Sequence, residues 1–341
     1  MCKHRMWLGS PVARDRARVS LFGLMLCVGV SCCHLAAGAT APVQGTEKAE
    51  SVAPDPQDPY LRAIVDLKKL VKEGDIGEVK HALGQIKDEF PDRVGPDLKW
   101  FALGETYYWR NRYSKALVKY ERLFKDFPGS EYAGLALERE FHIAQEYLQG
   151  RKKVFLKIIK ISGFAEGVEI MEKISDRAGM DEPNGIGLRA AICVAEQYEA
   201  RERYLDAYLK WSEIASYWET GPIGKRALYR MAEDNLAAYH LPPEARRAYF
   251  DASKLSTAKT YYQKFLLLYP EEAKQNEVPR KIEQIDELMA YKQYTIGRFY
   301  ARTGERRAAH LYFDMVVQNW PKTEAATLAK EALEENGDGG K

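Results

Sequence analysis

Cysteine is scarce beyond the first 33 residues of this 341-residue chain. Four of the five cysteines lie in that opening stretch, and only Cys193 follows it. A chain cleaved after Ala39 therefore forms no internal disulfide, so apolar packing must stabilise its fold. Cys193 falls within a helical pattern, where a small core residue is a better interpretation than a nucleophile.

Net charge is also low. The formal charge is +2, but the first 39 residues hold five basic groups and one acidic group, which leaves 46 basic and 48 acidic groups in the remainder. Nucleic-acid binding requires a concentrated basic surface. The near-neutral body of the chain therefore argues against a nucleic-acid partner.

The usual sequence signals of catalysis are missing. The chain has no glycine-rich phosphate loop ending in Lys-Ser/Thr, no HExxH and no cysteine pair at zinc spacing. Its later histidines are scattered over different predicted helices or loops: His81, His142, His240 and His310. We therefore expect no enzymatic activity, no cofactor and no metal site.

No apolar run reaches the ~20 residues of a membrane-spanning helix. The run Val19 to Val30 follows a basic stretch, which is typical of an export signal over residues 1–39. Two processing routes remain open. Ala37-Gly38-Ala39 is a small-x-small cleavage site, whereas Gly29-Val30-Ser31-Cys32 resembles a lipoprotein box that would place a lipid anchor on Cys32.

The remainder of the chain divides by composition. Residues 40–58 are rich in Ala, Pro, Glu and Gln and are interpreted as a flexible tether, and the Gly-rich residues 336–341 as a disordered tail. Between them, residues 59–335 show apolar positions at three- and four-residue spacing, without strand-like alternation. The predicted fold class is all-α.

An internal repeat sharpens this prediction. Gly104 precedes Ala116 by 12 residues and Pro128 by 24, and Gly297 precedes Ala309 and Pro321 by the same intervals. A third copy aligns Ala195 with Ala207. Trp100-x2-Leu103-Gly104-x2-Tyr107, Ala116-x3-Tyr120 and Pro128 match the tetratricopeptide consensus. Small residues allow the two helices of a pair to approach closely, and proline ends the second helix.

We expect a tetratricopeptide-repeat solenoid of about five to six antiparallel helix pairs plus a capping helix, because no single pair can bury its apolar face alone. The predicted pairs cover residues 59–91, 95–128, 130–179, 184–220, 222–270 and 279–321, with a capping helix over 322–335. Residues 150–162 and 240–251 are interpreted as insertions between helices.

The pattern as a whole resembles a known family. Aromatic-proline pairs end the repeats, a third repeat reads Ile161-Ser162-Gly163-Phe164-x2-Gly167, and Ala258-x2-Tyr261-Tyr262-x2-Phe265-x3-Tyr269-Pro270 follows. Together with the export signal, these features resemble the BamD (ComL) family of outer-membrane assembly lipoproteins over residues ~59–335.

This resemblance implies a non-enzymatic scaffold on the periplasmic side of the outer membrane, lipid-anchored or soluble. It also implies a BamA-type barrel insertase as partner and unfolded outer-membrane proteins as clients. The alternative is another periplasmic tetratricopeptide scaffold that coordinates envelope or cell-wall machinery.

Two stripes are candidate partner-binding surfaces. In the second pair, Phe101, Glu105 and Tyr108, with Trp109 beside them, are expected on the concave side, where rigid aromatics would hold an extended peptide. Packing on a neighbouring helix or on the tether is the alternative.

In the last pair, the corresponding stripe is Tyr291, Tyr294, Arg298 and Arg302. It either binds acidic groups of a partner or is a solvated face with local ion pairs.

A third candidate is the basic and apolar segment Arg151 to Lys160. One interpretation is a short interfacial helix that rests on anionic lipid or docks on a partner. The other is a simple extension of a neighbouring helix, with lysine stems buried and amino groups in solvent.

Overall fold

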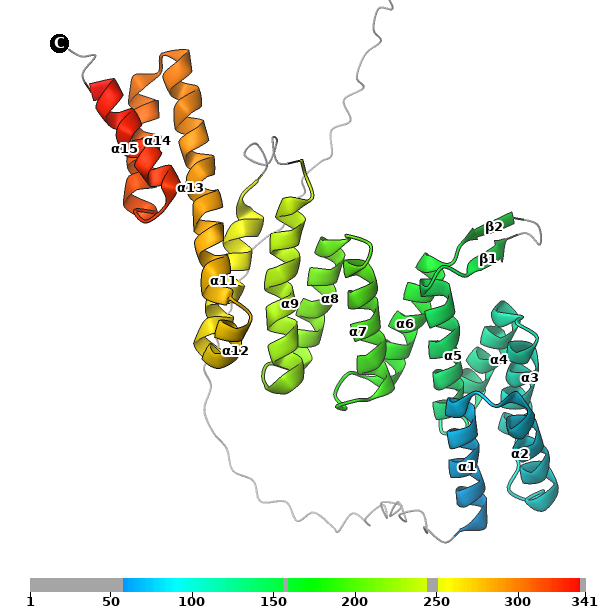
Figure 1. Cartoon of the computed structure of the whole chain (residues 1–341). Coiled ribbons are helices and arrows are strands. Elements are labelled where there is room, and N and C mark those ends of the chain that lie inside the picture. The colour runs from blue at the N-terminus through cyan, green and yellow to red at the C-terminus, as the bar shows by residue number, and fades with distance from the viewer. Residues whose placement is uncertain (1–57, 156–158, 244–250, 338–341) are drawn as a thin grey trace, which may run out of the picture. The chain divides into compact units, whose positions relative to one another are not determined.

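The computed structural model describes residues 58–155, 159–243 and 251–337 (Figure 1). The predicted export signal with Cys32, nearly all of the predicted tether and the last four residues, 338–341, lie outside the described residues. The described helices are α1 (Pro59–Glu73), α2 (Ile76–Glu89), α3 (Pro96–Trp109), α4 (Tyr113–Asp126), α5 (Ala133–Leu148), α6 (Phe164–Ala178), α7 (Ile186–Glu199), α8 (Tyr204–Tyr217), α9 (Gly221–His240), α11 (Ser253–Leu268), α12 (Pro270–Gln275), α13 (Val278–Thr303), α14 (Arg306–Asn319) and α15 (Glu324–Gly337).

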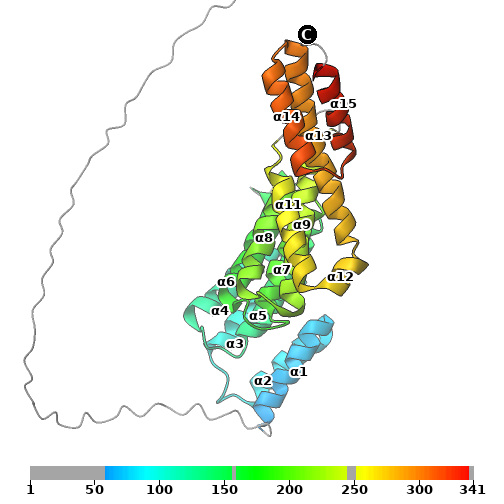
Figure 2. The ribbon, with the colours of Figure 1, turned by 90° about the vertical axis from the view of Figure 1, so that its left-hand side faces the viewer.

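The predicted helix pairs are confirmed. Each expected range contains two antiparallel helices, and from α5 to α9 every helix packs on the next one in the chain. The expected capping helix is α15, which packs on both α13 and α14 (Figure 2). The fold is the all-α tetratricopeptide-type stack that the sequence predicts.

The small residues of the repeat act as expected. A Cβ atom on Gly104 would lie 2.2 Å from Cε1 of Tyr120, and one on Gly297 would lie 2.6 Å from Cε1 of Phe313. In both pairs, therefore, the first helix approaches the aromatic ring of the second so closely that only glycine fits. Ala116 on α4 is also fully buried.

The helix ends follow local chemistry. The Asp58 carboxylate accepts a hydrogen bond from the Tyr60 N–H and caps α1, whose first residue is Pro59. Gly74 ends α1 with φ of 80°, and its N–H donates to the Leu70 carbonyl. Pro270 separates α11 from the short α12.

One prediction about secondary structure is wrong. The basic segment after α5 forms no interfacial helix and extends neither neighbour. It forms an antiparallel hairpin of β1 (Lys152–Phe155) and β2 (Ile159–Ser162), with Lys152 opposite Ser162 and Phe155 opposite Ile159. Gly150, at φ of 107°, breaks the chain away from α5, and the β-branched and aromatic residues beyond it favour extended backbone.

The second expected insertion, residues 240–251, is described only at its ends. Residues 244–250 lie outside the described part of the chain. Before this gap, α9 continues to His240, and after it α11 begins at Ser253.

The core consists of several apolar clusters that are shared between neighbouring helices. One cluster runs from α1 to α7, and others join α7 to α9, α9 to α13, and α13 to α15. The 26-residue helix α13 contributes Ile285 to one cluster and Tyr294 to the next. Because α13 is long, it joins α14 and α15 to the preceding helices α9 and α11.

Candidate partner-binding sites

The α3 stripe is largely an interior surface. Phe101 and Glu105 are fully buried, which corrects the expectation that both side chains face a partner. The Phe101 ring stacks on Tyr132 of α5 at a centroid distance of 5.6 Å and also contacts Tyr120 of α4. This face of α3 therefore packs on the following helices and is closed to a peptide.

Helix α1 closes the same region from the other side. The Tyr60 hydroxyl lies 3.2 Å from the Tyr132 hydroxyl, and the Val71 carbonyl accepts a hydrogen bond from Nη1 of Arg139. Four residues of α1 at helical spacing are buried in the shared cluster: Tyr60, Ile64, Leu67 and Val71. The chain's own first helix thus contacts the interior that the sequence suggested was available to a partner.

A buried ion pair lies at the centre of this packing. The Arg139 guanidinium donates two hydrogen bonds from Nε, both at 3.0 Å, and one from Nη2, at 2.9 Å, to the Glu105 carboxylate. The Tyr120 hydroxyl donates to the same carboxylate at 2.6 Å. Burial and the Glu105 charge raise the pKa of Tyr120 well above its ordinary value. Burial opposes the charge of Arg139, but Glu105 outweighs burial and raises the pKa of Arg139.

Tyr108 and Trp109 are only half-buried. Tyr108 stacks on Tyr113 at 5.5 Å and lies under the Arg139 guanidinium, whose carbon is 4.5 Å from the ring centroid. The Lys80 amino group lies 5.0 Å from the Trp109 ring centroid. Within the described residues, Nε1 of Trp109 is buried and has no hydrogen-bond partner. These two residues stand at the edge of the packed face.

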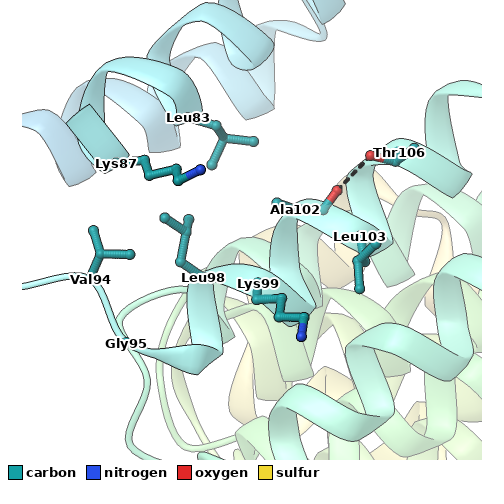
Figure 3. Close-up of a pocket in the computed structure, with 9 residues that line it drawn as sticks. All are labelled: Leu83, Lys87, Val94, Gly95, Leu98, Lys99, Ala102, Leu103 and Thr106. Atoms are coloured by element: carbon teal, nitrogen blue, oxygen red, sulfur yellow. Dashed lines mark hydrogen bonds between the residues drawn. The ribbon is translucent and has the colours of Figure 1, made fainter. Parts of the chain in front are cut away.

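The accessible part of α3 is its opposite face, which sequence reasoning missed. A cleft of about 420 Å³ separates α2 from α3 (Figure 3). Its apolar wall consists of Leu83, Val94, Leu98, Ala102 and Leu103, and its polar groups include Lys87, Lys99 and Thr106. Nothing in the residue spacing pointed to this cleft, because it is a space between helices and has no motif of its own.

The two lysines of the α2–α3 cleft are available to a partner. Among the residues that the structure describes, neither Lys87 nor Lys99 has an ion-pair partner. Figure 3 shows Leu83 and Leu98 facing one another across the cleft, with the Lys87 amino group beside them. An apolar wall beside unpaired ammonium groups suits an apolar peptide segment that carries carboxylates.

The residues of the stripe predicted in the last helix pair differ in their burial. Tyr294 is buried and packs on Phe313, so it is a core residue, whereas Tyr291 is 51% exposed. Arg298 and Arg302 line a second pocket, of about 520 Å³, between α13, α14 and α15. The two arginines thus line the same pocket, and their role in binding a partner stays a prediction.

This second pocket carries both signs of charge. Nη1 of Arg298 donates to the Tyr294 hydroxyl at 3.0 Å, and this bond raises the pKa of Arg298. Arg302 has no ion-pair partner among the described residues. Glu331 and Glu335 line the same pocket from α15. The arrangement suits a folded partner with complementary charges better than a simple anion.

Two further findings concern only the described residues. No group of three or more His, Cys, Asp or Glu side chains there has the geometry of a metal site. No helix there is both long enough and apolar enough to span a membrane.

Comparison with family models supports the resemblance over part of the chain. Residues 235–337 match the YfiO family, described as outer membrane lipoprotein, and residues 100–130 match a tetratricopeptide-repeat model. The chain thus contains a tetratricopeptide repeat and, over residues 235–337, is similar to BamD-family lipoproteins. The family match covers α11 to α15 and thus includes the pocket with Arg298 and Arg302, whereas the repeat match covers most of α3 and all of α4.

Three solved structures of low sequence identity are similar to this chain. PilW, a type IV pilus biogenesis factor, is 13% identical, with 79% of this chain and 97% of PilW covered at a TM-score of 0.30. A tetratricopeptide repeat protein from Parabacteroides merdae is 15% identical, with 81% and 98% covered, and the apo form of RapI is 11% identical, with 76% and 96% covered; both have TM-scores of 0.30. No curated protein matches.

Proposed function

We propose that this BamD-like chain is a non-enzymatic scaffold in the assembly and insertion of outer-membrane β-barrel proteins. The observation that carries the proposal is the match of residues 235–337 to an outer membrane lipoprotein family, in a chain built from tetratricopeptide-type helix pairs. Proteins of this repeat type generally bind other polypeptides, and stacked pairs offer extended surfaces for doing so.

The two accessible sites receive different partners in this proposal. The α2–α3 cleft binds an apolar, carboxylate-bearing segment of an unfolded client, because its wall is aliphatic and its lysines are unpaired. The pocket of Arg298 and Arg302 docks a folded partner, a BamA-type insertase, because it presents charges of both signs on packed helices.

The proposal places the protein on the periplasmic side of the outer membrane. Residues 1–39 direct export, and lipidation of Cys32 anchors the chain. Mass spectrometry of the mature protein tests this step: a diacylglyceryl group on Cys32 supports the anchor, and a free amino terminus at Thr40 identifies a soluble periplasmic protein.

The decisive experiment is depletion together with co-purification. Depleting the protein is expected to lower the levels of outer-membrane barrel proteins, and a tagged full chain is expected to co-purify with a BamA-type insertase. Unchanged barrel insertion, with recovery of cell-wall or other envelope enzymes in place of the insertase, would replace this proposal with a scaffold for that machinery.

A further inference from the structure

The hairpin between α5 and α6 is fixed at its base. The Arg151 guanidinium donates to the Glu146 carboxylate at 3.0 Å and to Oδ1 of Asn111 at 3.2 Å, and it lies 4.1 Å from the Tyr113 ring centroid. At the other end of the hairpin, a Cβ on Gly163 would lie 2.4 Å from the Arg151 carbonyl oxygen. The two strands therefore leave the helices at a defined place.

The strands themselves have open edges. Within the described residues the sheet consists of β1 and β2 alone, and neither strand packs extensively on a helix. An isolated two-stranded sheet is only marginally stable in water, and each strand has one row of unpaired N–H and C=O groups. A third strand would form hydrogen bonds with one of these rows of backbone groups.

The charge of the hairpin segment indicates which kind of strand would add to its edge. From Arg151 to Lys160 the sequence contains five basic residues and no acidic residue, while the rest of the chain beyond the export signal has more acidic than basic groups. Pairing of two such hairpins would bring like charges together, which disfavours a second copy of this chain as the occupant. An acidic strand is favoured because its carboxylates would lie opposite the basic residues of the hairpin.

We propose that the β1–β2 hairpin accepts one extended, acidic strand of another polypeptide by backbone hydrogen bonding along an open edge. The added strand makes a three-stranded sheet, in which the backbone provides affinity and charge provides selectivity. This contact site is separate from the α2–α3 cleft and does not depend on the proposed function.

The test uses the full chain and three fluorescent peptides in anisotropy titrations at low salt. The first peptide alternates glutamate and valine over eight residues. The second has the same sequence with four consecutive N-methylated residues, which keeps charge and side chains but removes backbone donors. The third replaces glutamate by lysine. We expect binding of the first peptide that is about tenfold tighter than that of the other two.

Matched variants locate the site. The triple variant Lys152→Gln, Lys153→Gln, Lys160→Gln is expected to weaken binding of the glutamate–valine peptide about tenfold. The control triple Lys125→Gln, Lys264→Gln, Lys330→Gln removes the same charge from exposed helix positions and is expected to leave it unchanged. Equal binding of the N-methylated peptide, or equal loss in both triples, would overturn the proposal.

A lipid surface is the competing occupant. Sedimentation with phosphatidylglycerol vesicles separates the two cases, because a basic segment that rests on anionic lipid binds vesicles and shows no preference for an unmethylated peptide backbone. Vesicle binding that is lost in the hairpin triple, combined with no peptide binding, would likewise overturn strand addition.

Discussion

At the residue scale, the contact between Glu105 and Arg139 shows why the α3 stripe could not be assigned from sequence. Helical spacing correctly places Phe101, Glu105 and Tyr108 on one side of α3. Spacing does not tell which other helix covers that side. The partner Arg139 is 34 residues away on α5, and Val71 on α1 completes its hydrogen bonds. Glu105, which was expected on the concave side, is instead neutralised inside the core.

The buried ion pair gives the first prediction. Arg139→Leu removes the positive partner of Glu105, a fully buried carboxylate with no other ion pair among the described residues, so we expect a loss of about 3–5 kcal/mol in the free energy of unfolding. Replacing both residues, Glu105→Leu with Arg139→Leu, leaves no unpaired charge and is expected to cost less than the single change. Urea unfolding followed by circular dichroism measures both. A double variant as unstable as the single one would contradict this account.

A second buried carboxyl predicts a pH dependence. Burial, followed by the nearby charge of Glu199, raises the pKa of Asp234 from 3.8 to about 8. Asp234 is 3% exposed, and its Oδ2 has no hydrogen-bond partner among the described residues. The folded chain therefore holds this proton more tightly than the unfolded chain. Its contribution to stability is complete below pH 3.8 and is lost as the pH rises through about 8.

Asp234→Asn tests this directly. Asparagine cannot ionise, so we expect the variant to melt about 2–4 °C higher than the parent chain near pH 9 and at nearly the same temperature below pH 3.8, where Asp234 is protonated in both the folded and the unfolded chain. The control Asp176→Asn changes an exposed aspartate and is expected to have no such pH-dependent effect. Melting curves at several pH values provide the measurement, and a constant difference across them would rule out the linkage.

At the scale of the helix pair, the sequence was sufficient to predict which helices pair wherever small residues determine the packing. The 12-residue interval from Gly104 to Ala116 predicts the α3–α4 pair, in which both small residues are buried and Gly104 lies against the Tyr120 ring. The hairpin was missed for a different reason. The four-residue strands β1 and β2 are too short for a reliable alternation, and their lysines also suit an amphipathic helix.

Glycine substitutions separate packing from helix propensity. Gly104→Ala favours the helix intrinsically, yet its Cβ would meet the Tyr120 ring, which is held by its hydrogen bond to Glu105. We expect a net loss of about 1–3 kcal/mol in stability. The control Gly84→Ala, in α2, meets nothing within 4 Å and is expected to gain about 0.5–1 kcal/mol. Denaturant unfolding distinguishes the two, and equal signs would refute the close-contact explanation.

At the scale of the whole molecule, stability and binding are distributed along the chain. The described apolar residues form separate clusters joined by shared helices, so each part depends mainly on its neighbours. The α2–α3 cleft and the pocket of Arg298 and Arg302 belong to different clusters. Neither site could be read from sequence in full, because each is a space left between helices and not a motif.

This separation predicts two independent losses of function. Ala102→Phe fills the α2–α3 cleft with a large side chain and is expected to weaken client-peptide binding about tenfold or more, without reducing insertase co-purification. Arg298→Glu with Arg302→Glu reverses the charge of the second pocket and is expected to do the opposite. The control Val118→Phe adds the same ring at a position that is 63% exposed and should affect neither.

Peptide titration and pull-down from the same preparations measure both effects, and circular dichroism checks that each variant keeps its helical content. Because the two sites share no residue and lie in different clusters, their coupling is expected to be small, so the combined variant should show both losses in full. If either variant abolished both peptide binding and insertase co-purification while remaining folded, the two partners would be bound by one continuous surface. The assignment of separate binding sites to the two ends of the chain would then be wrong.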